Sequence, residues 1–190
     1  DLVEMLLKAD AKCNIQDYSG NLPLQKAVEK GNTALVKMLL DYDPTIINEK
    51  QGYTEKTALH IAVQRDRIQM IQTLLDYHAD VNAVDNQGAT PLFSLFPKNY
   101  YTAVYPDILK RLIASGADVN IQQNNGDTPL HRAMFFSLYP EKMVQPLLDA
   151  RADVNMSNGK ITPLDMAKDL LQRGNKHQKI AAKLVLIAGG

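Results

Sequence analysis

The chain has 190 residues, of which 45% are hydrophobic and 22% charged. That apolar content is enough for a continuous core and excludes a disordered chain. The 21 basic residues balance the 21 acidic ones, which argues against nucleic acid as a partner, since such binding draws on clustered positive charge. No run of about 18 apolar residues is present for a membrane span. The single cysteine, Cys13, excludes an intrachain disulfide and a thiolate zinc site.

The chain begins within an apolar pattern. Residues 2–8 already have an apolar face at helical spacing. We therefore expect residues 1–16 to be a partial structural unit and the chain to be a piece of a longer one. The absence of a disulfide fits a reducing compartment, so we expect an intracellular location.

Two markers recur along the chain with nearly the same period. One is an asparagine that closes a short turn, and the other is the leucine of a Thr-Pro-Leu-like segment. The asparagines are Asn14, Asn48, Asn82, Asn120 and Asn155, and the leucines are Leu24, Leu59, Leu92, Leu130 and Leu164. This period indicates a repeat architecture. We place the repeats at 17–50, 51–84, 85–122, 123–156 and 157–190, after the partial unit 1–16.

Each repeat predicts two short helices and a projecting turn. A proline opens the first helix, where its missing N–H costs nothing, and a threonine before it can cap the free N–H groups. Apolar residues at helical spacing place second helices over 34–40, 68–75, 108–113 and 142–148. One repeat cannot bury its apolar face alone, so stacking of repeats into one solenoid domain over 1–190 is expected.

The segment Asn-Gly-Asp-Thr-Pro-Leu-His-Arg-Ala at 125–133 resembles the ankyrin-repeat signature, and Ala-Asp-Val-Asn at 79–82 resembles its closing turn. The resemblance implies an all-α ankyrin-repeat solenoid of stacked helix-turn-helix units with short hairpin-like turns. It also implies a non-catalytic scaffold that binds a protein partner through a concave face.

Carried onto this sequence, the resemblance assigns the partner-binding positions to the variable turn tips and the exposed ends of the first helices. The tip residues are Tyr18, Ser19, Asn21, Tyr53, Asn86, Gln87, Ala89, Asn124, Asn125 and Asp127. The helix positions are Glu29, Lys30, Gln64, Arg65, Phe135 and Phe136.

The last three repeats are longer than the first two between the threonine and the closing turn. We expect these extensions to fall between the two helices of each repeat and to form an insertion ridge, with Tyr100, Tyr101, Tyr105 and Tyr139 as its aromatic residues. Two interpretations stay open: the aromatic side chains pack on each other to hold the loops, or they provide contact surface for a partner.

Several positions depart from the ankyrin pattern. The glycine expected before the closing turn, in a left-handed conformation, is replaced by Asp10, Asp43, His78 and Arg151. Pro146 falls inside a predicted second helix, which is therefore either bent or begins later. Residues 160–190 hold six basic and two acidic residues. We expect a solvated cap there, with contact to an acidic partner as the alternative.

Motifs for catalysis are missing from the sequence. The four histidines lack metal-ligand spacing, with His60 and His131 expected to bond within their turns and His177 to lie in a polar loop. No phosphate loop or nucleophile elbow appears, so we expect no enzyme activity, cofactor or metal, and a monomer. The alternative is that the chain is the targeting or regulatory ankyrin segment of a larger multidomain enzyme or host-interacting effector.

Overall fold

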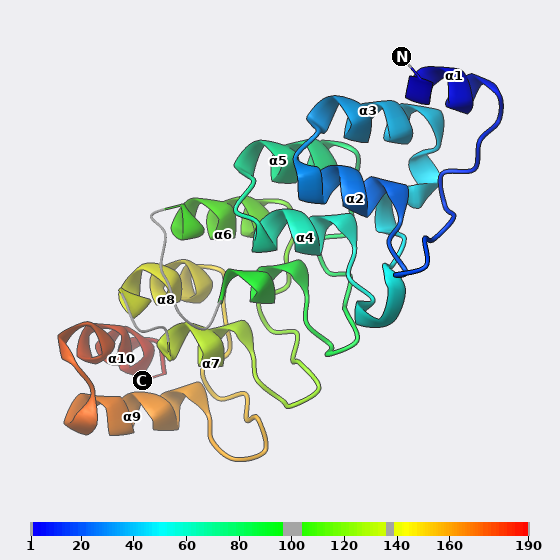
Figure 1. Cartoon of the computed structure of the whole chain (residues 1–190). Helices are drawn as coiled ribbons and strands as arrows, with labels where there is room; N and C mark the ends of the chain where they lie inside the picture. Colours follow the sequence, from blue (N-terminus) through cyan, green and yellow to red (C-terminus); the bar gives the residue numbers. More distant parts are fainter. Residues whose placement is uncertain (1, 97–103, 136–138, 190) are drawn as a thin grey trace.

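The computed structural model describes residues 2–96, 104–135 and 139–189, and over these residues it is a single stack of paired helices without a β-strand (Figure 1). One row holds the first helices: α2 (Pro23–Lys30), α4 (Ala58–Gln64), the 3-10 helix η3 (Pro91–Leu95), α7 (Pro129–Met134) and α9 (Pro163–Arg173). The other row holds α1 (Leu2–Lys8), α3 (Thr33–Tyr42), α5 (Ile68–Asp76), α6 (Tyr105–Ala114), α8 (Pro140–Asp149) and α10 (Lys176–Gly189). The all-α repeat solenoid is confirmed.

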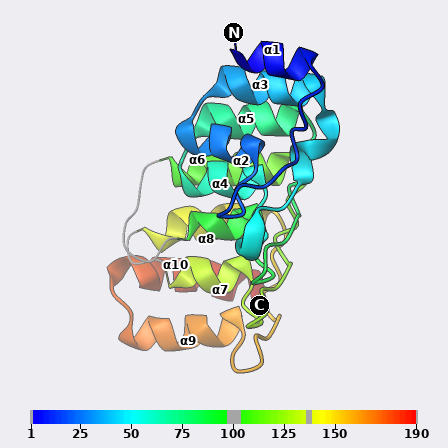
Figure 2. The same ribbon diagram turned by 45° about the vertical axis from the view of Figure 1, so that its right-hand side comes forward.

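The turns between repeats project to one side of the two rows, and the two chain ends lie at opposite ends of the stack (Figure 2). Two further 3-10 helices lie within these connections, η1 (Pro44–Asn48) and η2 (Gly52–Thr54). An antiparallel bridge between Gln51 and Lys56 joins the two sides of the turn around η2.

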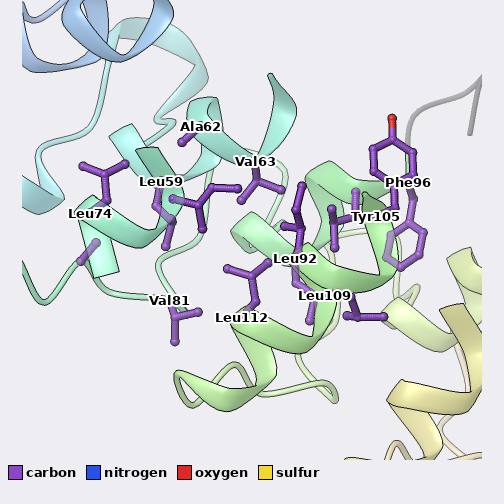
Figure 3. Packing of buried hydrophobic residues seen from close by; sticks show 14 of the residues in the cluster. Leu59, Ala62, Val63, Leu74, Val81, Leu92, Phe96, Tyr105, Leu109 and Leu112 are labelled. Carbon is purple, nitrogen blue, oxygen red and sulfur yellow. The ribbon is translucent and has the colours of Figure 1, made fainter. Parts of the chain in front are cut away.

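The core runs continuously along the stack because each repeat buries the same positions against its neighbour. Leu59 and Leu92, which are period-related, are both fully buried, and Val63 and Leu112 fill the space between their repeats (Figure 3). At the end of the stack the equivalent Leu164 is only partly buried. It has no following repeat to cover it among the described residues.

The predicted helix starts are confirmed in the structure. Thr128 and Thr162 are N-caps whose hydroxyl oxygens accept hydrogen bonds from the backbone N–H groups of His131 and Asp165, at 3.3 and 3.0 Å. Prolines at the first helical turn keep their expected place in α2, η3, α7 and α9. Proline therefore marks these four starts, whereas the expected side-chain cap is present at α7 and α9 and missing at η3, where Thr90 makes no cap hydrogen bond.

The glycine-replacing positions behave as expected with one exception. Asp10, His78 and Arg151 have φ values of 57°, 61° and 64°, in the left-handed region. Asp43 does not, with φ −138°, because its carboxylate accepts the backbone N–H of Thr45 at 3.0 Å and caps η1 instead.

The structure excludes one of the two alternatives for Pro146 and corrects one expectation about the last repeat. α8 begins at Pro140 and runs through Pro146, so Pro146 is an interior helix proline and not a sign of a later start. The extra length of the last repeat is not a loop, because α9 has 11 residues and α10 has 14, and Gly189 lies in α10. The predicted insertion ridge does not extend into this repeat.

Candidate protein-binding surface

Three of the turn tips share one backbone geometry. In each, the first residue donates its N–H to the carbonyl oxygen of the fifth, over 17–21, 85–89 and 123–127, at 2.9, 3.0 and 3.0 Å. The fourth residue is a glycine with φ between 70° and 84°, a conformation that costs other residues free energy. This turn points its second and third side chains outward: Tyr18 and Ser19, Asn86 and Gln87, Asn124 and Asn125.

The tips also stack on one another, and this uses some of the predicted contact residues. Asn86 donates its backbone N–H to the carbonyl of Thr54 and its amide to the carbonyl of Tyr53, at 3.1 and 2.9 Å. Asn124 makes the same two bonds: its backbone N–H donates to the carbonyl of Gln87 and its side-chain amide to the carbonyl of Asn86, at 2.9 and 3.1 Å. The two asparagines therefore hold the row of tips together, and Gln87 and Asn125 remain exposed beside them.

The two N-terminal tips carry fully exposed tyrosines. Tyr18 and Tyr53 have exposed fractions of 113% and 93%. Their turns are in close backbone contact, since a Cβ added to Gly20 would lie 2.9 Å from the Cα of Gly52. Two aromatic side chains thus project from adjacent tips.

The ends of the first helices form the other edge of the surface. Glu29 and Lys30 end α2, and Gln64 ends α4, followed by the exposed Arg65. Phe135, which follows α7, has an exposed fraction of 67%. This edge combines charged groups with one large aromatic side chain.

Charges near the surface are largely compensated within it. Lys26 lies 3.5 Å from the carboxylate of Glu29, and Arg132 lies 3.9 Å from that of Asp127. Asp17 accepts hydrogen bonds from the side chain and backbone of Asn21, which hold the pKa of its carboxyl group below the ordinary value. The two ion pairs therefore cancel their own charges, whereas the lowered pKa keeps Asp17 negatively charged.

Some predicted tip residues form hydrogen bonds with a neighbouring repeat and are not free to contact a partner. Asn21 is half-buried and its side-chain oxygen accepts a hydrogen bond from Gln51 at 2.7 Å. Asp127 is half-buried and accepts a hydrogen bond from the Asn158 amide at 2.8 Å. Ala89 is buried, so its placement in the contact set was wrong.

The prediction that Tyr105 belongs to the insertion ridge is wrong. Its side chain has an exposed fraction of 1% and packs into the core at the start of α6 (Figure 3). Tyr139 is 38% exposed, and its ring meets the ring of His177 edge-on at 4.7 Å. His177 itself lies in α10, not in a polar loop, and its Nδ1 is 3.1 Å from a Glu141 carboxylate oxygen. Tyr100, Tyr101 and Phe136 lie outside the described residues.

The periodic asparagines have a role that the sequence interpretation missed. The side-chain oxygens of Asn48, Asn82 and Asn120 each accept the backbone N–H of the aspartate that opens the next closing turn, at 2.8 Å in all three cases. Asn82 and Asn120 also donate to a carbonyl of the following repeat. Their recurrence at the repeat period was the available signal, because a bond made once per repeat requires one residue per repeat.

The histidines of the first helices form a second set of links between repeats. His60 accepts the N–H of Thr57 at Nδ1 and donates from Nε2 to the carbonyl of Ala89, at 3.2 and 2.9 Å. His131 does the same with Thr128 and Ile161, at 3.1 and 3.0 Å. The expected bonding within the turn is confirmed, and the link to the next repeat is an addition.

Three repeats replace this histidine, by Gln25, Phe93 and Asp165. Gln25 is fully buried and donates to the carbonyl of Glu49 at 2.6 Å, so it keeps a link to the next repeat. Phe93 has no polar group, and the hydroxyl of Thr90 beside it is buried without a partner. The first helix of that repeat is the short 3-10 helix η3.

The described part of the chain offers few groups arranged for metal binding or nucleophilic catalysis. No group of three or more His, Cys, Asp or Glu side chains there is placed to hold a metal ion. Cys13 is buried, and burial raises the pKa of its thiol, so the nucleophilic thiolate is disfavoured. None of the helices between residues 2 and 189 that the structure describes combines the length and apolar character of a membrane span.

Comparison with known proteins identifies the repeats. A family model for ankyrin repeats (three copies) matches residues 1–85 and 46–105, and a second for ankyrin repeats (many copies) matches residues 105–145.

Among curated proteins, the BTB/POZ domain and ankyrin repeat-containing protein NH5.2 of Oryza sativa subsp. japonica is 40% identical over 76 residues, which is 40% of this chain and 15% of that protein. Regulatory protein NPR6 of Arabidopsis thaliana is 43% identical over 72 residues, 38% of this chain and 15% of that protein. Neurogenic locus notch homolog protein 1 of Cricetulus griseus is 35% identical over 92 residues, 48% of this chain and 4% of that protein. The matched segments thus span a small part of each relative.

Ankyrin repeats are, as a family, non-catalytic protein-interaction modules, and with its paired helices, stacked tips and matched residues this chain belongs to the ankyrin-repeat family.

Proposed function

We propose that this chain is a non-catalytic scaffold that binds a partner protein or peptide across its concave face. That face is bounded by the turn tips on one edge and by the ends of the first helices on the other. Its contact residues are Tyr18, Tyr53, Gln87 and Asn125 on the tips, and Lys30, Arg65 and Phe135 on the helix ends.

The observation that carries the proposal is that two sets of residues have different roles. The periodic residues, such as Asn82, Asn120 and His131, form hydrogen bonds between repeats. The residues that differ from repeat to repeat, above all Tyr18 and Tyr53, project into solvent. A rigid frame that presents exposed aromatic side chains loses little conformational entropy when a partner binds.

Affinity should depend on few residues. Tyrosine and arginine are enriched among the side chains that dominate binding energies, and truncation of such an anchor commonly costs about 2 kcal/mol or more. We therefore expect Tyr18, Tyr53 and Phe135 to dominate, with the neighbouring amides contributing orientation.

The test compares two variants in quantitative pull-downs. The first is the triple variant Tyr18→Ala/Tyr53→Ala/Phe135→Ala, and the control is Tyr42→Ala, which removes an exposed tyrosine from α3 in the other row. The triple variant should lose specifically bound proteins that the control keeps. An unchanged set of bound proteins in the triple variant would remove the concave-face assignment.

A second proposal is that the chain is the targeting or regulatory segment of a larger protein, either a multidomain enzyme or a host-interacting effector, acting inside a cell. Its support is that the curated relatives match over 4–17% of their lengths, and that several carry a BTB/POZ domain by name. The sequence of the intact polypeptide tests it, and a full-length protein made only of ankyrin repeats would exclude it.

Light scattering tests the further proposal that this 21.2 kDa chain is a monomer.

A further inference from the structure

The last helix of the stack, α10 (Lys176–Gly189), carries uncompensated positive charge. Its lysines are Lys176, Lys179 and Lys183, and it contains no aspartate or glutamate. None of these three lysines takes part in an ion pair among the residues that the structure describes. This is unusual even within the same repeat, because α9 neutralises its own basic residues, with Lys168–Asp165 at 3.2 Å and Arg173–Asp169 at 3.3 Å.

The three lysines line a hollow with an apolar residue among them. Together with Gly174 and Ile180 they line an open surface hollow of about 460 Å³. Their spacing of i, i+3, i+4 and i+7 puts Lys176, Lys179, Ile180 and Lys183 on one face of the helix. Ile180 is 39% exposed in this position, whereas Ala181, Ala182 and Val185 on the opposite face are buried in the core.

The hollow is not the free start of the helix. The side-chain oxygen of Asn175 accepts the backbone N–H of Gln178 at 2.9 Å, which caps the first turn of α10. The feature is therefore made by side chains, with the ammonium groups spread over about 10 Å along the helix, at about 1.5 Å per residue.

The chemistry of this hollow selects its occupant. Three ammonium groups favour carboxylates, and an exposed isoleucine between them favours an aliphatic side chain. Residues 160–190 hold six basic and two acidic residues, so residues 1–159 hold 15 basic and 19 acidic ones. That acidic excess disfavours an extended polyanion such as nucleic acid or an anionic membrane surface, whereas a short acidic segment meets only the local charge.

We propose that this face of α10 is a docking site for an acidic protein segment that also bears leucine or isoleucine. The ammonium groups of Lys176, Lys179 and Lys183 pair with its carboxylates, and Ile180 contacts its aliphatic side chain. α10 belongs to the second row of helices (Figure 1), so this surface is separate from the concave face and does not depend on the function proposed for it.

The test measures binding of a short fluorescein-labelled peptide of glutamate and leucine by fluorescence anisotropy. We expect saturable binding that weakens with rising salt, and a loss of about tenfold in affinity for Lys176→Gln/Lys179→Gln/Lys183→Gln. The matched control is Lys12→Gln/Lys37→Gln/Lys110→Gln, which removes the same charge from exposed positions elsewhere and should leave affinity within about twofold. Thermal unfolding followed by circular dichroism shows that both variants stay folded.

Two further arms separate the alternatives. Ile180→Ser should abolish the preference for the glutamate–leucine peptide over an all-glutamate peptide, because it removes the apolar contact. Equal weakening by the two triple variants would overturn the proposal, as would equal binding of the two peptides to the unmodified chain. Tighter binding of phosphatidylserine vesicles or of single-stranded DNA than of the peptide would also overturn it.

Discussion

Replacing His60 by leucine tests whether buried histidines hold neighbouring repeats together. The imidazole is fully buried, accepts the N–H of Thr57 and donates to the carbonyl of Ala89. Leucine keeps the apolar contacts but leaves the N–H of Thr57 without its partner, and the carbonyl of Ala89 keeps only the hydrogen bond from the N–H of Asp85. A buried unsatisfied polar group costs about 1–3 kcal/mol and a lost hydrogen bond about 1 kcal/mol, so we expect the free energy of unfolding to fall by about 2–4 kcal/mol.

The chain provides its own control for this substitution. Gln25 occupies the equivalent position two helices earlier and still donates to the next repeat, so His60→Gln should cost about 1 kcal/mol, the worth of one weakened hydrogen bond. Urea unfolding followed by circular dichroism measures both variants, and hydrogen exchange at the Thr57 amide locates the effect. A loss below about 0.5 kcal/mol for His60→Leu, or equal losses for both variants, would refute the link.

The same residue predicts a pH dependence. Burial lowers the pKa of His60 in the folded chain from its ordinary value of 6.5. The unfolded chain therefore binds a proton first as the pH falls below about 6.5, and stability present above that pH is lost progressively toward the lower folded pKa. Unfolding curves between neutral and mildly acidic pH should show a smaller loss in His60→Gln, and an unchanged slope would contradict this.

Three further predictions concern the stability of the stacked repeats. Gly126→Ala should destabilise the chain more than Gly116→Ala, by about 1 kcal/mol or more. Both glycines have positive φ, but only at Gly126 would an added Cβ meet a backbone oxygen, that of Asn158 at 2.7 Å. Thermal unfolding compares the two variants. Tyr105→Ala should cost about 3–5 kcal/mol in urea unfolding because it empties a buried aromatic site. Pro146→Ala should raise the free energy of unfolding by about 1–3 kcal/mol by restoring a helix hydrogen bond, and a decrease would show that its packing matters more.

The candidate surface was only partly predictable from the sequence. Tyr18 and Gln87 follow from the turn pattern alone, because a glycine with positive φ directs the two residues before it outward. Asn124 occupies the same turn position as Tyr18, yet its amide bonds to the carbonyl of Asn86 in the preceding tip. That partner lies 38 residues away, so no local rule assigns it.

What the amino-acid sequence determined by itself was the repeat period, the helix starts and the left-handed turns, because capping residues, prolines and glycines act within a few residues of their own position. Burial was decided by the tertiary structure. Tyr105 follows an aromatic, tyrosine-rich segment that suggested exposure, but stacking of neighbouring repeats places it in the core. The extra residues of the last repeat lengthened α9 and α10 instead of forming a loop, which the threonine and closing-turn spacing does not distinguish.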